Sequence, residues 1–242
     1  MKKKGLIIGI IVLIVVLILG WIGWTVYDQL KQEEILRQEV SEIESAILNV
    51  TVEETDVQNL EGVTSKLDEI KTTGDCAIVE QAIKECFKDI INTAIDISDI
   101  LKEEQIQNML SAENYQTDGP EFINSTAYIS DVKTRIEEEK NRFLSLCTEE
   151  TVMSYINQKT DDEYLVDLYR EIMIGEGEII KQEDKENFET SLEQVNRILD
   201  VEEQIINLLK NNKGNWTIEN NQIMFNSNQL VQQYNGLLNE LQ

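Results

Sequence analysis

The side chains of this sequence that could do acid–base chemistry are nearly all carboxylates. The 242 residues include 46 Asp and Glu, and four groups of them stand close together in the chain. These groups are Glu137–Glu139, Asp161–Glu163, Glu176 with Glu178, and Glu202–Glu203. A glycosidase needs two carboxyl groups across a cleft, and a calcium loop needs oxygen ligands at fixed spacing around a glycine. No group has either pattern, so we expect solvated helix surfaces, with Asp161–Glu163 placed at a helix start by the helix dipole.

Histidine is absent, which narrows the chemistry further. Imidazole is the commonest general base and the commonest ligand of transition metals. Its absence excludes His-containing catalytic triads, HExxH sites and His-bearing zinc sites. We therefore expect a protein that is not an enzyme and that holds no cofactor or metal. An envelope hydrolase based on Asp or Glu is the least favoured alternative.

The three cysteines could form a disulfide. Cys76 and Cys86 are ten residues apart on one predicted helix, about 15 Å, which is too far for a bridge. If helices 75–110 and 120–147 pair in antiparallel fashion, Cys86 and Cys147 face each other. Two alternatives stay open: a Cys86–Cys147 disulfide that stabilises by about 3–4 kcal/mol, or three buried thiols that pack as small hydrophobic groups.

Three aromatic residues near the C-terminus are the remaining candidates for binding. Residues 216–225 alternate in polarity about Asn220–Asn221, which suits a type I′ turn and predicts a small β-hairpin. A lone hairpin is marginal in water, so its aromatic side chains should lean on a helix. Trp216, Phe225 and Tyr234 would then meet in one corner, which either lines a binding groove or belongs to the hydrophobic core.

The elements that position these residues begin with an apolar run. From Gly5 to Trp24 the chain carries no charge, and twenty helical residues span the ~30 Å hydrocarbon core of a bilayer. Thirteen of the fourteen residues 6–19 are Leu, Ile or Val. The alternative, a cleaved signal peptide, has a shorter apolar region and a small-residue cleavage site. We predict an uncleaved signal-anchor helix over residues 5–27 that crosses the lipid bilayer once.

The charges around the run predict its orientation. Lys2–Lys4 precede it, and residues 28–37 behind it carry no positive excess. Because positive charge stays in the cytoplasm, residues 1–4 form a cytoplasmic stub and residues 28–242 lie outside the cell membrane. The usage of Asn, Ile, Lys and Glu is typical of a low-GC bacterium, so we expect a bacterial surface protein.

Small residues follow one side of the predicted membrane helix. At 100° per residue the four glycines of the run fall within an arc of about 60°, and two valines fill the gap between them. This face consists of Gly5, Gly9, Val12, Val16, Gly20 and Gly23. Such a face lets another helix approach closely, so it predicts self-association or a partner transmembrane helix, although glycine is also simply common in membrane helices.

Residues 28–242 are expected to form an all-α helical bundle. One proline and 11 glycines leave few breaks, and hydrophobic residues recur at alternating spacings of three and four, as in coiled-coil seams. The predicted helices cover residues 75–110, 120–147, 149–158, 161–175, 184–211 and 227–241, with a polar turn at 111–119. Two linked sub-bundles with a break near 158–184 are an alternative.

The charge of this region limits its partners. Outside the predicted anchor there are 46 acidic and 18 basic residues, which argues against binding nucleic acid through bulk electrostatics. Partners should be neutral, basic or bridged by cations. We expect a non-catalytic interaction or scaffold module whose protein partner the sequence does not identify. The alternative is an accessory subunit of a membrane complex, recruited through the glycine-striped helix.

Overall fold

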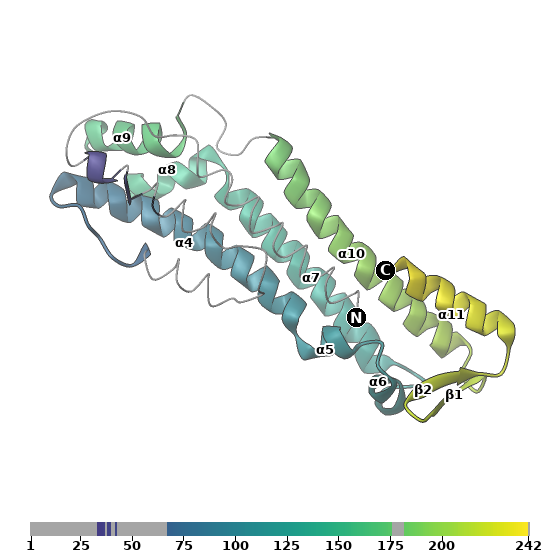
Figure 1. The fold of residues 1–242 in the computed structure, drawn as a ribbon. Coiled ribbons are helices and arrows are strands. Elements are labelled where there is room, and N and C mark those ends of the chain that lie inside the picture. The colour runs from purple at the N-terminus through teal and green to yellow at the C-terminus, as the bar shows by residue number, and fades with distance from the viewer. Residues whose placement is uncertain (1–32, 37, 40–41, 43–66, 176–181, 242) are drawn as a thin grey trace. The chain divides into compact units, whose positions relative to one another are not determined.

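The computed structural model describes part of the chain (Figure 1). The described residues are 33–36, 38, 39, 42, 67–175 and 182–241. The predicted membrane helix over residues 5–27, with its glycine-striped face, lies outside them. Among the described residues no helix is long and apolar enough to cross a membrane.

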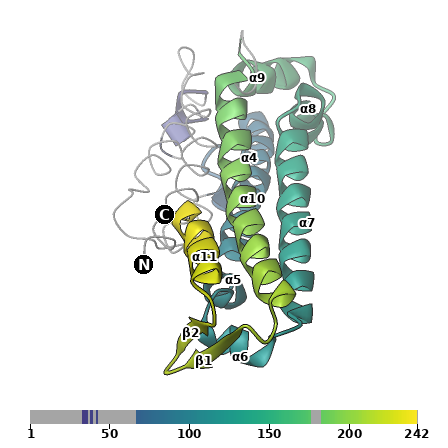
Figure 2. The same ribbon diagram turned by 90° about the vertical axis from the view of Figure 1, so that its right-hand side faces the viewer.

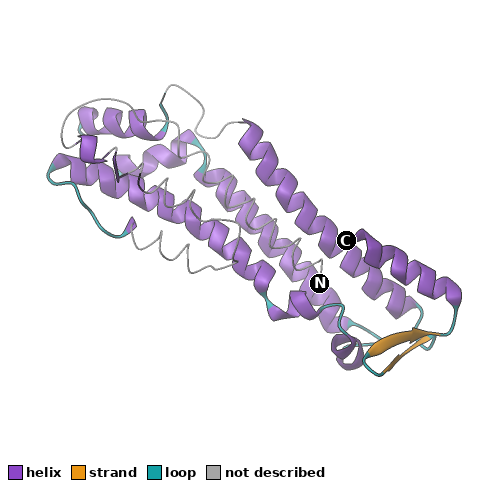
Figure 3. Ribbon diagram, in the orientation of Figure 1, coloured by secondary structure: helices purple, strands orange, loops and turns teal. Residues whose placement is uncertain are grey.

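Helices make up most of the described chain, and its strands form one antiparallel hairpin (Figure 3). The elements are α4 (Asp75–Lys102), α5 (Glu104–Asn108), α6 (Ala112–Thr117), α7 (Ile123–Leu146), α8 (Glu149–Asn157), α9 (Glu163–Met173), α10 (Gln182–Asn211), β1 (Trp216–Glu219), β2 (Gln222–Phe225) and α11 (Asn228–Glu240). The predicted helical, bundle-like architecture with a single small hairpin is therefore confirmed for the described residues.

Two compact units are distinguished in the chain. Among the described residues, unit 1 contains residues 98–138 and 191–241, and unit 2 contains the described parts of 33–97 together with 139–175 and 182–190. Helices α4, α7 and α10 contribute residues to both units. The predicted break near 158–184 falls within the range of unit 2 and stays a prediction.

In unit 1 the hydrophobic seams predicted from spacing form the core. The side chains of Ile129, Val132 and Ile136 on α7 are buried, as are those of Val195, Leu199, Ile206 and Leu209 on α10. Lys133 of α7 reaches Asp200 and Glu203 of α10 at 2.6 and 2.7 Å, so these two helices lie beside each other. At one end of the unit, β1 contacts α6 and β2 contacts α11 (Figure 2).

The hairpin has the predicted turn and register. Asn220 and Asn221 take left-handed conformations with φ of 51° and 61°, as a type I′ turn requires. Trp216 is paired with Phe225 across the strands. Ser227 then caps α11, because its hydroxyl accepts the N–H of Leu230 at 3.2 Å.

Unit 2 contains the other parts of the three long helices together with α8 and α9. The predicted seam of α4 is buried at Val79, Ile83, Cys86, Ile90, Ala94 and Ile97. Phe143 of α7 and Phe188 of α10 lie against each other with ring centroids 4.2 Å apart. Thr148 caps α8 by accepting the N–H of Thr151, which confirms the predicted helix start.

The helix predicted over residues 75–110 is interrupted at Glu103, and this part of the prediction is wrong. Glu103 has an extended conformation (φ −52°, ψ 132°) and separates α4 from α5. Its carboxylate accepts two hydrogen bonds from Arg135 of α7, at 2.6 and 2.9 Å, and one from Tyr128. The hydrogen bonds from Arg135 lower the pKa of Glu103 to about 2. Because the interactions come from a distant segment, no local sequence signal marks the break.

The polar turn predicted over residues 111–119 contains a short helix, α6. Ser111 caps this helix by accepting the N–H of Asn114 at 3.1 Å. The Asn114 side chain in turn donates to the carbonyl of Met109 and to the hydroxyl of Ser125. Polar residues that favour a turn are here used to cap and brace a helix of six residues.

The sequence predicted a helix start at Pro120, but helix α7 begins at Ile123. The reason is Asp118, whose carboxylate accepts the backbone N–H groups of Asn124 and Ser125 at 3.1 and 2.7 Å. These groups belong to the first helical turn, where N–H donors have no partner within the helix. Asp118 therefore sets the start of the helix.

Candidate functional site

Five aromatic rings meet at the hairpin end of unit 1, and we call this group the aromatic corner. It contains Tyr115 of α6, Phe122, Trp216 of β1, Phe225 of β2 and Tyr234 of α11. Trp216 stacks on Phe122 with centroids 5.9 Å apart, and Phe225 lies 5.2 Å from Tyr234. The three residues predicted to form a binding corner are thus brought together, and two unpredicted rings complete the group.

The polar atoms of the aromatic corner are used within the protein. The indole N–H of Trp216 donates to the carbonyl of Leu209 at 2.9 Å. The hydroxyls of Tyr115 and Tyr234 are 3.0 Å apart and hydrogen-bonded. Burial raises the pKa of both tyrosines, so both hydroxyls stay neutral at physiological pH. These contacts attach the hairpin and α11 to α6 and favour a structural role over ligand recognition.

The turn beside the aromatic corner admits only glycine at residue 119. A Cβ atom on Gly119 would come within 2.4 Å of the carbonyl oxygen of Tyr115 and 2.9 Å of the Trp216 ring. Phe122 follows with a left-handed φ of 49° and a fully buried side chain. The sequence offered no signal for the conformation of Phe122, because a left-handed Phe is rare and its burial depends on Trp216, some ninety residues later.

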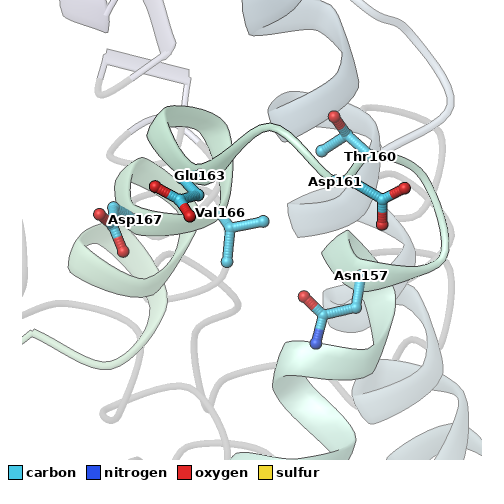
Figure 4. Close-up of a pocket in the computed structure, with 6 residues that line it drawn as sticks. All are labelled: Asn157, Thr160, Asp161, Glu163, Val166 and Asp167. Atoms are coloured by element: carbon cyan, nitrogen blue, oxygen red, sulfur yellow. The ribbon is translucent and has the colours of Figure 1, made fainter.

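Carboxylates line a shallow cleft between α8 and α9 of unit 2 (Figure 4). The cleft has a volume of about 330 Å³ and is lined by Asn157, Thr160, Asp161, Glu163, Val166 and Asp167. Thr160 and Asp161 lie on one side, whereas Glu163 and Asp167 project from α9 on the other. Asp162 caps α9 by accepting the N–H of Tyr164 at 2.9 Å, so the predicted helix start is confirmed to within two residues.

The carboxylates of the cleft do not converge on a metal position. Within the described residues, no group of three or more Asp, Glu or Cys side chains is arranged to hold a metal ion. The cleft therefore offers negative charge without a coordination geometry.

A buried group of charged side chains in unit 2 is the second concentration of polar atoms, and we call it the Lys84 cluster. Its centre is Lys84 of α4, whose Nζ lies 2.6 Å from Glu80 and 3.3 Å from Glu39. The side chains of Lys84 and Glu80 are only 2% and 1% exposed. Lys84 also donates to the backbone carbonyl of Glu69. Buried charges are costly unless they are paired, so the cluster depends on these partners staying in place.

Glu80 ties the loop that precedes α4 to the helix. Its carboxylate accepts the backbone N–H of Lys71 at 3.0 and 3.1 Å, and both the N–H and the hydroxyl of Thr72 at 2.7 Å. Burial by itself raises the pKa of Glu80, but the hydrogen bonds from Lys84, Thr72 and the backbone outweigh it and bring the pKa below its usual value of 4.5. Glu80 is therefore ionised at neutral pH.

The Lys84 cluster was not predicted. Glu80 and Lys84 are spaced i, i+4 on α4, which on a sequence looks like an ordinary surface ion pair. Their partners outside α4 are Glu39 and the backbone of residues 69–72, whose position the local pattern cannot give. A buried lysine between two glutamates has the composition of a catalytic centre. Here the N–H groups of Lys84 instead connect α4 with Glu39 and with the carbonyl of Glu69.

The cysteines are free thiols in the structure. Cys86 is buried, and Cys76 and Cys147 are half-buried. Burial raises the pKa of Cys86 to about 12 and raises that of Cys147 as well, with the nearby Cys86 contributing. Both thiols are therefore protonated at neutral pH.

The segments that carry Cys86 and Cys147 run in opposite directions in unit 2. The hydroxyl of Tyr155 donates to Asp89 at 2.6 Å, and Arg142 lies 2.8 Å from Asp96. The order of these contacts agrees with the antiparallel pairing assumed for the Cys86–Cys147 bridge. The bridge itself stays a prediction.

Comparison with known proteins identifies no relative. No protein-family model matches the chain, and no curated protein or solved structure matches it.

Proposed function

We propose that the chain is a membrane-anchored protein whose acidic helical bundle lies outside a bacterial cell and acts as a non-catalytic interaction or scaffold module. The observation that carries this proposal is the uncharged run from Gly5 to Trp24 behind Lys2–Lys4, followed by a long acidic region. The run has the length and composition of a membrane-spanning helix, and the lysines orient it.

The chemistry of the described residues supports a binding role over catalysis. Two carboxylates with close cationic partners, Glu80 and Glu103, are used to hold segments of the fold. The aromatic corner uses its own polar groups internally. The cleft between α8 and α9 is lined by three carboxylates, Asp161, Glu163 and Asp167, so a basic or neutral protein surface is the partner that fits best.

Membrane fractionation of a bacterial host that expresses the full chain tests the anchor. The wild type should sediment with membranes and resist alkaline carbonate. Replacing Leu13→Lys and Leu17→Lys together should release the protein, because each charge at the helix centre costs about 2.5–3.5 kcal/mol. Ile123→Lys is the matched control, since Ile123 is exposed in the bundle. A wild type in the soluble fraction, or a double variant that stays in the membrane, would contradict the proposal.

A second candidate is an accessory subunit of a membrane complex, which the glycine-striped face from Gly5 to Gly23 favours. Replacing residues 1–27 by an unrelated anchor separates the two roles. Cross-linking in intact membranes followed by mass spectrometry should recover the same partner if the bundle binds it alone. Loss of that partner would favour recruitment through the transmembrane helix.

A further inference from the structure

The described residues between 33 and 42 are helical and belong to unit 2. Glu33 accepts a hydrogen bond from the hydroxyl of Tyr164 on α9. Leu36 is fully buried, and Glu39 is 5% exposed. Glu39 pairs with Lys84 on α4 and with Lys71 in the loop before it. We call these residues the 33–42 segment, which thus contacts two helices and a loop.

The loop over residues 69–73 is held by some of the same groups. Its backbone N–H groups at Lys71 and Thr72 bind Glu80, and its carbonyl at Glu69 binds Lys84. The Lys71 side chain reaches back to the 33–42 segment at Glu39 and Glu42. Each segment therefore supplies charges that the other needs.

We propose that the 33–42 segment and the 69–73 loop bind α4 as one cooperative element, with Lys84 as the shared contact, so that release of one releases the other. Removing the segment leaves Lys84 with one carboxylate fewer and frees Lys71 from Glu39. Removing the loop leaves the Glu80 carboxylate without its backbone donors. Since a buried ion that loses a partner is strongly destabilised, partly detached states are disfavoured and the element has two states, bound and released.

This element is a conformational coupling device. The 33–42 segment begins six positions after residue 27, the end of the predicted anchor. If the chain is anchored as proposed above, on which this step rests, any change at the anchor that releases the 33–42 segment would also release the 69–73 loop from α4. Because each buried charge of the cluster needs its own partner, the paired charges allow one register.

Hydrogen exchange on the purified full-length chain tests the coupling. The probe is the peptide that contains residues 69–73. The variant is Glu39→Gln, which keeps the shape of the side chain and removes its charge. Glu39 does not itself bind the backbone of this peptide, which is held by Glu80. We expect exchange in the 69–73 peptide to rise at least about tenfold, together with exchange in residues 33–42, because hydrogen bonds to charged groups are lost from the shared cluster. Tyr164→Phe should raise exchange in the same peptide to a smaller extent.

Lys88→Met is the matched control. Lys88 lies one turn beyond Lys84 on α4 and pairs with Asp68 at 2.6 Å, but both side chains are largely exposed. Exchange in the 69–73 peptide of this variant should stay within about twofold of the wild type, because an exposed ion pair contributes little.

Three results would overturn the coupling. Glu39→Gln could accelerate exchange in residues 33–42 only, it could leave both peptides unchanged, or it could accelerate the hairpin peptide of unit 1 equally. The last result would mean global unfolding rather than local release. None of these readouts depends on the membrane, so failure here is distinct from failure of the fractionation experiment.

Discussion

The aromatic corner of unit 1 and the Lys84 cluster of unit 2 both attach chain segments to helices, but with opposite chemistry. The aromatic corner uses five rings and one pair of neutral hydroxyls. The Lys84 cluster uses buried ions that bind one another and the backbone. Ring contacts gain energy from buried area and weaken gradually as they separate. Buried ions are stable only when every partner is present.

The two regions should therefore respond differently to a change of conditions. The aromatic corner should respond little to pH or to a change elsewhere in the chain. The Lys84 cluster should respond to any change that removes a partner, including a displacement of residues 33–42. We therefore expect the hairpin end of unit 1 to keep one structure. The 33–42 segment of unit 2 should stay bound only while the partners of the Lys84 cluster are in place.

The largest expected effect breaks the aromatic corner. Phe122→Ala should lower the free energy of unfolding by about 3–5 kcal/mol, because a fully buried ring is replaced by a cavity. The loss should be the same at pH 4 and pH 7. Chemical denaturation at both pH values measures it, with Met224→Ala as the control, since Met224 is 48% exposed and its loss should cost less than about 0.5 kcal/mol. A loss below 1 kcal/mol for Phe122→Ala would show that the corner is not packed as described.

The second prediction concerns a disulfide between Cys86 and Cys147 in unit 2. If Cys86 and Cys147 form a disulfide outside the cell, reduction should lower the free energy of unfolding by about 3–4 kcal/mol. Non-reducing mass spectrometry of protein taken from the membrane of intact cells detects the bridge, with Cys76 as the thiol that should stay free. Three free thiols would leave buried hydrophobic packing as the role of these residues.

Glu80→Gln should reveal the pH sensitivity of the Lys84 cluster. At pH 7 the substitution should cost about 1.5–3 kcal/mol, since it removes hydrogen bonds to a charged group. The pKa of Glu80 is lowered in the folded protein, so the unfolded chain binds a proton more readily and the contribution of the carboxylate is complete above about pH 4.5. It is lost as the pH falls through the folded pKa, and the difference between wild type and variant should shrink there. A difference that does not vary with pH would contradict this assignment.

The smallest effect tests the neutral hydrogen bond of the aromatic corner. Tyr234→Phe should lower the free energy of unfolding by about 1 kcal/mol, the usual contribution of a hydrogen bond between neutral groups. The loss should not change between pH 4 and pH 8, because both hydroxyls stay neutral. In a double-mutant cycle with Tyr115→Phe, the two losses should not add, and additive losses would mean that the hydroxyls do not interact.

The sequence predicted elements whose signals are local. Asn220–Asn221 marked the hairpin turn, and the seams of three long helices were found from the spacing of apolar residues. The helix starts predicted at residues 149 and 227 agree to within one residue with the starts that Thr148 and Ser227 cap. In each case the residues that carry the signal also form the structure, so no distant partner was needed.

The features that the sequence did not reveal depend on distant partners. The break at Glu103 is held by Arg135, and the burial of Phe122 involves Trp216. The Lys84 cluster is enclosed by Glu39, forty-five positions before it. Two of the five aromatic-corner residues were missed for the same reason, since Tyr115 and Phe122 lie in a stretch that was expected to be a polar turn and a helix start.

The most direct test of the central proposal, an anchored bundle outside the cell, is labelling of intact bacteria with a membrane-impermeant maleimide. Ile123→Cys in the full chain supplies an exposed thiol, since Ile123 is 69% exposed, and the wild type, whose cysteines are buried or half-buried, gives the background. We predict that the variant is labelled in unbroken cells and that the labelled protein sediments with the membrane. Labelling that appears only after the cells are permeabilised would contradict the proposal.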